Sequence, residues 1–286
     1  MIDRLSSQAG SGQVTLSDRS KYGTSVNGQR MEGDEPVAEG TVITFGLQWN
    51  TWTLSWRPLT VATSLLSPAD RQQLGQWLIE LGATLLQEWA PTVDFLVMTS
   101  FKLSVKSVQA LAAGVPVVTP AYVRTSCECW RESTISPAVT PDDFQPPFDE
   151  PSLNGPDFNL GVDPRRRTLF AGKQFVFTDE AQHQRMRSAI QLAGGTSMLL
   201  SDGKLSASQL VTPDVMVMHT DVESPGINRV KAVLKRKRLR MVRDQEIGLA
   251  VLRVSTERDC NPAFNYKAAF VTPLAGSQSQ GVHAGR

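Results

Sequence analysis

The 286-residue sequence predicts a mixed fold, in which a partial all-β sandwich is followed by two α/β units with parallel sheets. Three observations lead to this prediction. Residues 14–56 alternate short runs of strand formers with polar turns, as antiparallel sandwiches do. Residues 67–120 instead have the order helix, strand, strand, helix, strand, which requires parallel crossover connections. The first half of that order returns within residues 186–218 and indicates a second unit of the same kind.

The N-terminal region predicts strands at residues 14–16, 22–26, 41–45 and 49–56. The pair Asn27-Gly28 predicts a two-residue hairpin turn, because both positions of such a turn need a positive φ angle. Residues 1–13 are small and polar, and we expect them to form no stable element.

The first α/β unit has clear helix boundaries. Ser67 is the expected N-cap of the first helix, Pro68 occupies its first position and Gly82 ends it. Ser104 precedes the second helix and Gly114 follows it. Apolar runs predict the strands of the unit, at residues 59–62, 83–89, 93–98 and 115–119.

The second unit repeats part of this pattern. A helix with apolar residues at 186, 189, 190 and 193 ends at Gly194-Gly195, and a strand at residues 196–200 follows. Residues 213–218 then resemble the strand at residues 93–98. Beyond Met218 we expect a single long helix, with no counterpart of the short helix and strand at residues 104–119.

Composition excludes several function classes. The 29 basic and 28 acidic residues nearly balance, so bulk charge predicts no polyanion partner. Three cysteines cannot form a disulfide framework and favour a reducing compartment, and no apolar run approaches the ~18 residues of a membrane span. The three histidines are scattered, and Cys127-x-Cys129 lacks the second pair of a zinc site. We therefore expect no metal, no cofactor and no enzymatic activity.

The N-terminal motif resembles a known domain family. Asp18-x-Ser20-x-Tyr22-Gly23-Thr24-x-Val26-Asn27-Gly28, followed by Gly40-x-x-Ile43-x-Phe45-Gly46, resembles the second half of forkhead-associated (FHA) domains, which read phosphothreonine. The resemblance makes Tyr22, Gly23, Thr24 and Asn27 the remnant of the FHA motif. Residues 1–12 are too few for the roughly five strands that carry the phosphate-binding residues of the family. We expect a weakly stable half-sandwich that cannot bind phosphothreonine.

The repeated α/β units resemble BRCT domains, whose first helix ends in Gly or Gly-Gly before a strand. An FHA segment running into two BRCT units resembles the scaffold subunits of the nuclease–ATPase complex that senses DNA double-strand breaks, and residues 20–24 and 246–251 are typical of that group. The expected division is a partial FHA-like sandwich (1–57), a first BRCT-like domain (58–132), a proline-rich linker (133–164), a second BRCT-like domain (165–262) and a disordered tail (263–286).

The resemblance implies a nuclear, chromosomal adaptor. Its expected partners are a phosphorylated checkpoint mediator and the double-strand-break nuclease–ATPase complex, together with the ATM kinase. In proteins of this group the motifs that bind the nuclease and the kinase lie far beyond the position that corresponds to Pro262.

A phosphate pocket is predicted where the first BRCT-like strand meets its helix. Thr63 and Ser64 place hydroxyl groups beside the free N–H groups of a helix N-terminus, which attract anions. Lys106 lies in the first turn of the second helix, where a cation opposes the helix dipole unless an anion is bound nearby. In BRCT domains that bind phosphoserine, a Ser or Thr and a Lys at the matching positions hold the phosphate. Lys102 is a second candidate contact.

The alternative interpretation is that Ser64 is a turn residue and Lys106 a solvated surface lysine. The second unit is predicted to lack the helix that would carry an equivalent lysine. One phosphate site per chain is therefore expected, with the second unit packing against the first to form the groove beside the phosphoserine.

A basic run is the other candidate binding surface. It contains eight basic residues and no acidic one, namely Arg229, Lys231, Lys235, Arg236, Lys237, Arg238, Arg240 and Arg243. Its centre, residues 235–238, could contact DNA weakly, serve as a nuclear import signal or attract acidic phosphopeptides, or it could be an ordinary solvated helix face. The triplet Arg165-Arg166-Arg167 is interpreted as a charge cluster of the linker.

The linker itself contains seven prolines. Phe144, Phe148 and Phe158 are expected to anchor it along the interface between the repeats. Two other functions stay open at this point. The chain could be a structural module that reads no phosphate, or the regulatory part of a DNA-joining or ADP-ribosylating enzyme whose catalytic segment lies elsewhere.

Overall fold

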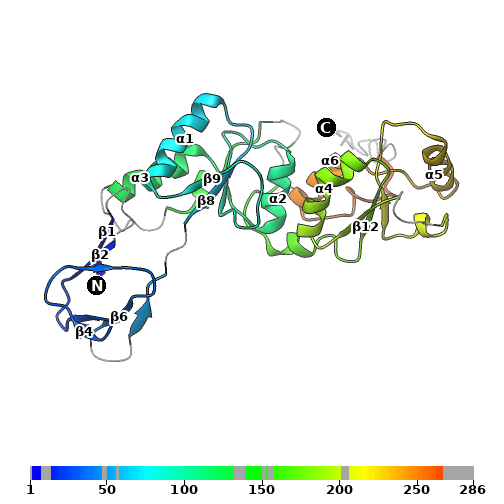
Figure 1. The fold of residues 1–286 in the computed structure, drawn as a ribbon. Coiled ribbons are helices and arrows are strands. Elements are labelled where there is room, and N and C mark those ends of the chain that lie inside the picture. The colour runs from blue at the N-terminus through cyan, green and yellow to red at the C-terminus, as the bar shows by residue number, and fades with distance from the viewer. Residues whose placement is uncertain are drawn as a thin grey trace, which may run out of the picture.

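The structure is a computed structural model that describes residues 2–7, 14–46, 50–55, 58–131, 139–149, 153, 158–200 and 206–266. Its elements form an N-terminal β part followed by two α/β units, and Figure 1 shows the β part set apart from the two units. No helix within the described residues combines the length and the hydrophobicity that crossing a membrane requires.

The N-terminal part consists of two antiparallel sheets. The first has the order β1 (Ile2–Ser7), β2 (Val14–Asp18), β5 (Glu35–Val37), and the second the order β4 (Gln29–Arg30), β3 (Thr24–Val26), β6 (Val42–Phe45), β7 (Thr51–Thr53). Their shared core holds few side chains, namely Leu16, Val26, Met31, Val37 and Ile43. The expectation that residues 1–13 form no element is wrong for β1, which pairs with β2 through backbone hydrogen bonds that need no apolar pattern.

The predicted hairpin is confirmed. Val26 and Gln29 are paired residues of β3 and β4, and the two residues between them have φ angles of 49° for Asn27 and 84° for Gly28. The Asn27 side chain also accepts a 2.9 Å hydrogen bond from the Val42 N–H, which ties the turn to β6. The predicted strand at residues 49–56 is shorter than expected, at Thr51–Thr53, and residues 47–49, 56 and 57 lie outside the described residues.

The first α/β unit has the predicted order of elements. It contains β8 (Thr60–Thr63), α1 (Pro68–Glu80), β9 (Thr84–Leu86), β10 (Phe95–Val97), α2 (Val105–Ala113), β11 (Val117–Val118) and α3 (Pro120–Arg131). The four strands form a parallel sheet in the order β11-β10-β8-β9. Parallel pairing directs the carboxyl ends of β8 and β10 to the same edge of the sheet.

The helix caps of this unit are the predicted ones. Ser67 Oγ accepts a 3.1 Å hydrogen bond from the Asp70 N–H at the start of α1. At α2, Ser104 forms a capping box with Ser107, and Gly114 ends the helix in the left-handed conformation with φ 71°. Such caps satisfy N–H and C=O groups that have no partner within the helix.

The second unit is more complete than predicted. It contains the 3-10 helix η3 (Pro164–Thr168), β12 (Gln174–Phe177), α4 (Glu180–Leu192), β13 (Thr196–Leu199), the 3-10 helix η4 (Gln209–Val211), β14 (Val215–Val217), α5 (Pro225–Arg236) and α6 (Asp244–Arg253). Its strands are parallel in the order β13-β12-β14.

The expected omission of a helix and strand after Met218 is wrong. Helix α5 occupies the place of α2, and Val242 then forms a parallel bridge with Met218 where β11 pairs with β10 in the first unit. Helix α6 follows as α3 does. A strand reduced to one bridge leaves no apolar run in the sequence, so the two helices could not be separated by pattern alone.

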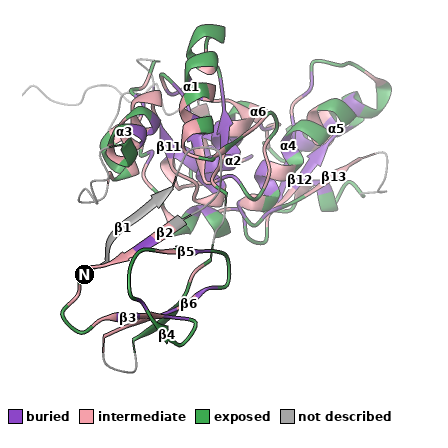
Figure 2. Ribbon diagram, turned by 60° about the vertical axis from the view of Figure 1, so that its left-hand side comes forward, coloured by how far each residue is buried: buried purple, intermediate pink, exposed green. Residues whose placement is uncertain are grey.

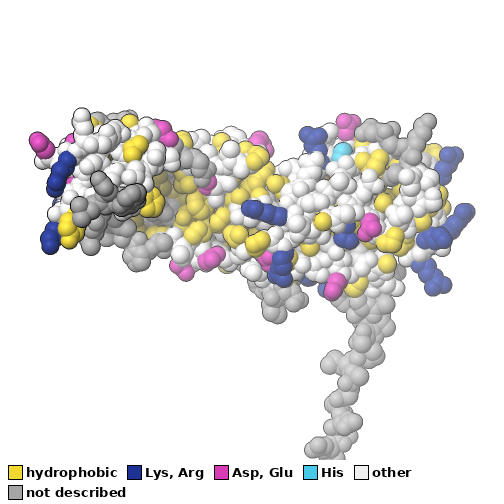
Figure 3. All heavy atoms as spheres, turned by 90° about the horizontal axis from the view of Figure 1, so that it is seen from below, with side chains coloured by type: hydrophobic (Ala, Val, Ile, Leu, Met, Phe, Trp, Pro, Cys, Tyr) yellow, Lys and Arg dark blue, Asp and Glu magenta, His cyan; other side chains and the backbone are white. Residues whose placement is uncertain are grey.

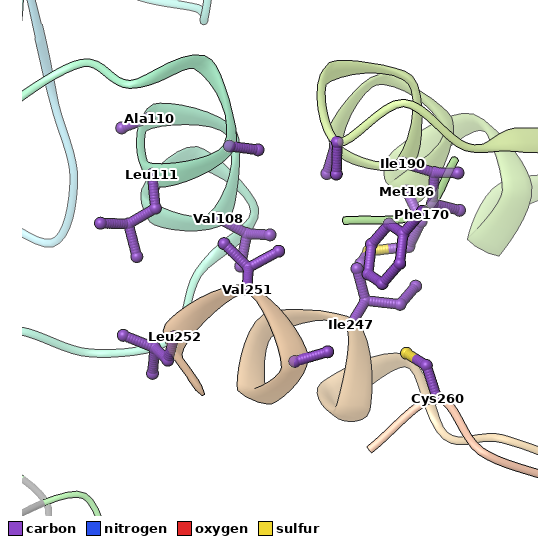
Figure 4. Close-up of a cluster of buried hydrophobic side chains, with 14 of the residues drawn as sticks. Val108, Ala110, Leu111, Phe170, Met186, Ile190, Ile247, Val251, Leu252 and Cys260 are labelled. Atoms are coloured by element: carbon purple, nitrogen blue, oxygen red, sulfur yellow. The ribbon is translucent and has the colours of Figure 1, made fainter. Parts of the chain in front are cut away.

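The two units share one hydrophobic core. Helix α2 packs against α4 and α6, and Figure 4 shows Val108 of α2 facing Val251 of α6, with Met186 and Ile190 of α4 nearby. Gly248 of α6 allows this close approach, since a Cβ there would lie 2.8 Å from Leu103 Cδ2. Figure 2 shows that the buried residues gather in the strands and on the helix faces between the units.

Phe148 and Phe158 pack against the core that the two units share, as predicted, whereas Phe144 packs in the separate core of the first unit. Phe144 ends the 3-10 helix η1 (Pro141–Phe144) and its ring lies 5.7 Å from that of Tyr122. The ring of Phe148 lies 5.4 Å from Phe101 and 6.3 Å from Phe158, measured between centroids. Residues 132–138, 150–152 and 154–157 lie outside the described part of the linker.

The interpretation of Arg165-Arg166-Arg167 as a solvated charge cluster is wrong. The Arg166 side chain is completely buried, and its guanidinium donates to three main-chain carbonyls, those of Asn159, Gly161 and Val251. Arg167 donates a 2.8 Å hydrogen bond from Nη2 to the Ala113 carbonyl at the end of α2. These arginines therefore join the linker and the second unit to the first.

The beginning of the predicted tail is also ordered. Tyr266 donates a 3.0 Å hydrogen bond to Asp259, and the Arg240 guanidinium lies 4.7 Å from the centre of its ring. Burial, with the carboxylates of Glu246 and Asp259 nearby, raises the pKa of Tyr266 to about 12. Residues 267–286 lie outside the described part of the chain, where the prediction stays untested.

Candidate phosphate-binding site

The predicted site residues meet where β8 ends and α1 and α2 begin. The Ser64 N–H donates to the Val97 carbonyl of β10 at 3.2 Å, which fixes the end of β8 beside the neighbouring strand. The hydroxyl groups of Ser64 and Ser104 are 2.9 Å apart. Ser104 caps α2, so Ser64 lies directly at the N-terminus of that helix.

Lys106 comes from the first turn of α2 and turns back toward β8. Its ammonium donates to the main-chain carbonyls of Thr63, at 3.4 Å, and of Gln87. The Thr63 carbonyl belongs to the peptide group that leads into Ser64. Ser64, which is buried, and Lys106 therefore lie on the same edge of the unit.

Sequence reasoning missed a second cation at this edge. Arg71 of α1 donates from Nη2 to Thr63 Oγ1 at 3.0 Å and from Nη1 to Gln87 Oε1 at 3.3 Å. Its Nε is buried and has no hydrogen-bond partner among the described residues. The feature of the sequence that pointed to Arg71 was its position in the first turn after the Ser67 cap, because that turn of α1 lies beside the end of β8.

Leu65 is a further residue of this edge that the sequence did not indicate. This residue follows Ser64 with φ 56° and is 62% exposed. The left-handed conformation costs a non-glycine residue roughly 1–2 kcal/mol, and such strain gathers at functional sites. Among the described residues no acceptor lies within hydrogen-bond distance of the Leu65 N–H.

Thr63 and Lys102 are placed differently from the other two candidates. The Thr63 side chain is buried, and its hydroxyl accepts from Arg71. Lys102 forms a 2.7 Å ion pair with Asp149 of the linker. The structure thus brings Ser64, Lys106 and Thr63 together with Arg71 and directs Lys102 toward the linker.

A groove begins next to these residues. It holds about 250 Å³ between α2, α4 and α6 and is lined mainly by apolar groups, including Leu103, Val105, Val108 and Met186. Ser104 lies in its wall and also contacts Ser64, so the groove and the polar edge adjoin. At its other side Arg185 of α4 and Asp244 of α6 form a 2.9 Å ion pair.

The residues of the FHA motif hold the N-terminal loops. Gly23 accepts a hydrogen bond from the Gly46 N–H through its carbonyl, and with φ 81° it passes so close to Arg30 that a Cβ would overlap the guanidinium. Thr24 is buried, whereas the Tyr22 ring is exposed. Upstream, hydrogen bonds from Ser20 lower the pKa of Asp18. Thr24 and Asn27 therefore support the fold of the N-terminal part, and the Tyr22 side chain is exposed to solvent.

The basic run is divided by the structure. Arg240 faces inward and pairs with Glu246 at 2.6 Å, and Lys231 lies 4.0 Å from Glu223. Residues 235–238 are exposed at the end of α5.

Cysteine and histidine form no cluster with carboxylates in the described residues that could hold a metal ion. Cys127 is buried in α3, and burial raises the pKa of its thiol to about 11.

Comparison with known proteins identifies the chain. Residues 164–262 match the family model for the second BRCT domain on Nijmegen syndrome breakage protein, and residues 3–46 match the model for the FHA domain. Nibrin from Gallus gallus is 33% identical over 260 residues, which cover 87% of this chain and 34% of that protein. This chain is a nibrin homologue. Nibrin from Rattus norvegicus is 31% identical over 95% of the chain and 38% of its own length.

The chain spans about a third of the length of the curated nibrins it matches. Among solved structures, the Nbs1–Ctp1 complex of S. pombe is similar with a TM-score of 0.47 and 14% identity, over 85% of this chain and 74% of that chain. The S. pombe Nbs1 FHA-BRCT1-BRCT2 domains are similar with a TM-score of 0.45 and 15% identity, over 79% of this chain and 78% of that chain. The two family models confirm the resemblance to FHA and BRCT families stated from sequence, and the sheets of the structure confirm the predicted mixed fold.

Proposed function

We propose that this chain is a non-enzymatic adaptor of the DNA-damage response whose first BRCT unit binds a phosphoserine in an acidic peptide. The observation that carries the proposal is that two cations donate to Thr63. The Lys106 ammonium donates to the Thr63 carbonyl, and the Arg71 guanidinium donates to the Thr63 hydroxyl. The hydrogen-bonded hydroxyl groups of Ser64 and Ser104 lie next to them. Two cations and two hydroxyls at one helix N-terminus suit a doubly charged, oxygen-rich ligand.

The chemistry of phosphoserine fits this edge. A phosphoserine carries about −1.5 to −2 charges at neutral pH and three strong acceptor oxygens. Lys106 and Arg71 would exchange their contacts with neutral carbonyl, hydroxyl and amide oxygens for charged phosphate oxygens, which accept stronger hydrogen bonds. The Ser64 hydroxyl and the Leu65 N–H, which donates to no acceptor among the described residues, would hold the remaining oxygens. An unphosphorylated serine offers none of these acceptors.

The adjoining groove supplies the second part of recognition. A peptide bound through phosphate beside Ser104 would continue over the apolar wall formed by Val105, Val108 and Met186. Because α2, α4 and α6 together form that wall, the second BRCT unit contributes to selection of the residues beside the phosphoserine. Residues far from the phosphate thereby determine which phosphopeptide binds.

One such site is expected per chain. Lys106 is the second residue of α2, and Gly226 is the second residue of the corresponding helix α5. The sequence predicted a single site because the second unit was expected to lack the helix. In the structure the helix is present as α5, but glycine takes the place of the lysine.

The proposed partner is a phosphorylated checkpoint mediator, and the proposed role is to bring the double-strand-break nuclease–ATPase complex to damaged chromatin. Membership in the nibrin family supports this role, together with a nuclear, chromosomal location. The nuclease complex and the ATM kinase are proposed to bind nibrin segments outside these residues.

The test compares an acidic peptide with and without one phosphoserine, by calorimetry on the whole chain. We expect tighter binding of the phosphorylated form and loss of that preference in Lys106→Met, by about 10-fold or more, since a charged hydrogen bond contributes ~1.5–3 kcal/mol. Lys102→Met is the matched control, because its ion pair with Asp149 lies at the linker, and it should keep the preference. Equal binding of both peptides by the wild type would reject the proposal and leave a structural module.

A further inference from the structure

Four consecutive cations form an exposed surface at the end of α5. This basic cap consists of Lys235, Arg236, Lys237 and Arg238, which are all exposed. Among the described residues no carboxylate lies within ion-pair distance of any of the four, although the chain as a whole carries a net charge of only +1. Figure 3 shows Lys and Arg side chains at the end of the molecule where α5 lies, and others in the middle and at the opposite end.

Two of the neighbouring basic residues do not extend the cap, since Lys231 lies near Glu223 and Arg240 is held by Glu246 and Tyr266. Arg229 of α5 is exposed, so the helix carries a further basic side chain besides the cap.

Helix capping accounts for only part of this arrangement. One or two cations in the last turn stabilise a helix through its dipole, but four in sequence repel one another. Arg238 has φ 57°, in the position after the helix where glycine is strongly favoured. An arginine there weakens the helix end and contributes a further charge, which indicates a role in binding.

We propose that the basic cap binds the phosphate backbone of duplex DNA. The fold argues against the import signal that the sequence left open, because Lys235 and Arg236 are helical and Lys237 is the C-cap, whereas a receptor would need an extended segment. An acidic peptide would need a groove, and none of the three described grooves is lined by residues 225–238.

Single-stranded nucleic acid is also a poorer partner for this surface. Proteins bind single strands by stacking bases on exposed aromatic rings. Among the described residues, the exposed large aromatic side chains are Tyr22, Trp52 and Trp130, which belong to the N-terminal part and the first unit. A convex cluster of cations without a stacking surface fits the regular phosphates of a duplex, which carries one charge per about 1.7 Å.

The position of the cap allows both ligands at once. Figure 1 shows α5 at the end of the α/β part away from α1, whose first turn borders the phosphate pocket. A chain could hold a phosphopeptide at one end and DNA at the other. This inference does not depend on the phosphopeptide proposal, since it uses different residues.

The test measures binding of a fluorescent 20-base-pair duplex to the whole chain by anisotropy over a range of salt. With four cations on phosphates, the slope of log K against log salt should be about −3 to −4, so that affinity falls roughly 100-fold between 50 and 200 mM salt. The variant Lys235→Gln/Arg236→Gln/Lys237→Gln/Arg238→Gln should lose most of that slope and bind at least about 10-fold more weakly at low salt. Arg124→Gln/Arg187→Gln removes exposed cations of α3 and α4 and should behave as the wild type.

Arg238→Gly separates binding from stability. It should raise the melting temperature, because glycine suits the left-handed position, and should lower DNA affinity and reduce the slope by about 1. If the quadruple variant is unstable, Lys235→Gln/Arg236→Gln replaces it with two exposed helical positions. Unchanged DNA binding in these variants overturns the proposal, as does tighter binding of a single strand, an acidic peptide or an anionic vesicle at the same salt. Lys106→Met should leave duplex binding unchanged, which keeps the two proposals distinguishable.

Discussion

Arg166 donates a 2.9 Å hydrogen bond from Nε to the main-chain carbonyl of Val251, although no part of the Arg166 side chain reaches solvent. Its other nitrogens donate to the carbonyls of Asn159 and Gly161, so one side chain joins the linker to α6. Burial lowers the pKa of Arg166, yet an arginine remains charged in proteins. Carbonyl dipoles stabilise the charge, and the carboxylate of Asp163 offsets part of the effect of burial on the pKa of Arg166.

Replacing Arg166 should destabilise the tandem unit. In Arg166→Met the three carbonyls lose their donors inside the protein, which predicts a loss of about 2–5 kcal/mol in the free energy of unfolding. Urea denaturation measures this loss in the free energy of unfolding. Arg165→Met is the control, because Arg165 is exposed and its ion pair among the described residues is with Asp163, two positions earlier, and it should change stability by less than about 0.5 kcal/mol. Similar effects of the two substitutions would contradict the structural role of Arg166.

Gly248 should tolerate no side chain. In Gly248→Ala the new Cβ would lie 2.8 Å from Leu103 Cδ2 and 3.1 Å from Val108 Cγ2, so α2 and α6 must move apart. We expect a loss of about 1–3 kcal/mol in unfolding free energy and weaker phosphopeptide binding, since the same residues line the groove. Gly75→Ala in α1 meets no atom within 4 Å and should instead stabilise the chain by about 0.5–1 kcal/mol. A stable Gly248→Ala with normal peptide affinity would refute the packing argument.

Arg71 should contribute to phosphate binding as a second cation. Arg71→Gln keeps hydrogen-bonding capacity toward Thr63 and Gln87 but removes the charge, so we expect about 10-fold weaker binding of the phosphopeptide and little change for the unphosphorylated form. Calorimetry at low and high salt measures the affinities of the phosphorylated and the unphosphorylated peptide. Arg124→Gln, at an exposed position of α3, serves as the control. Equal loss for both peptides would assign Arg71 a purely structural role.

The thiols should differ in reactivity. Cys127 and Cys260 are buried, and burial raises the pKa of both, that of Cys127 to about 11. At about pH 8 neither forms the reactive thiolate, so a thiol reagent should modify the partly accessible Cys129 quickly and the other two only after unfolding. A Cys127→Ala variant should show the same single fast thiol.

The raised pKa of Cys127 also determines how the free energy of unfolding changes with pH. The folded-state pKa of Cys127 lies above the ordinary value of 9.0, so the folded chain holds the proton more tightly. This contribution to stability is fully present below about pH 9 and is lost as the pH rises through about 11. Denaturation of the wild type and Cys127→Ala at several alkaline pH values should therefore show a difference that shrinks as the pH rises.

Local features of the fold were predictable from sequence. The Ser67 and Ser104 caps, the Gly114 stop and the Asn27-Gly28 turn follow from interactions between residues at most a few positions apart. The second unit shows the limit of this reasoning. The pairing of Met218 with Val242 involves one bridge between distant residues, and no periodicity in the sequence marks it.

The candidate site shows the same limit. Ser64 and Lys106 could be singled out by resemblance to BRCT domains, because each follows a recognisable element. Arg71 could not, since its role depends on α1 bringing the guanidinium back to Thr63 at the end of β8.

The sequence by itself determined the order of the elements in the first α/β unit, the duplication of that unit and the position of its helix ends, because these depend on neighbouring residues and on the spacing of apolar side chains. Only the tertiary structure decided which charges are available to a ligand. Arg166, Lys231 and Arg240 looked equivalent to Arg238 along the chain. In the structure, main-chain carbonyls engage Arg166, the carboxylates of Glu223 and Glu246 engage Lys231 and Arg240, and Arg238 is exposed at the end of α5.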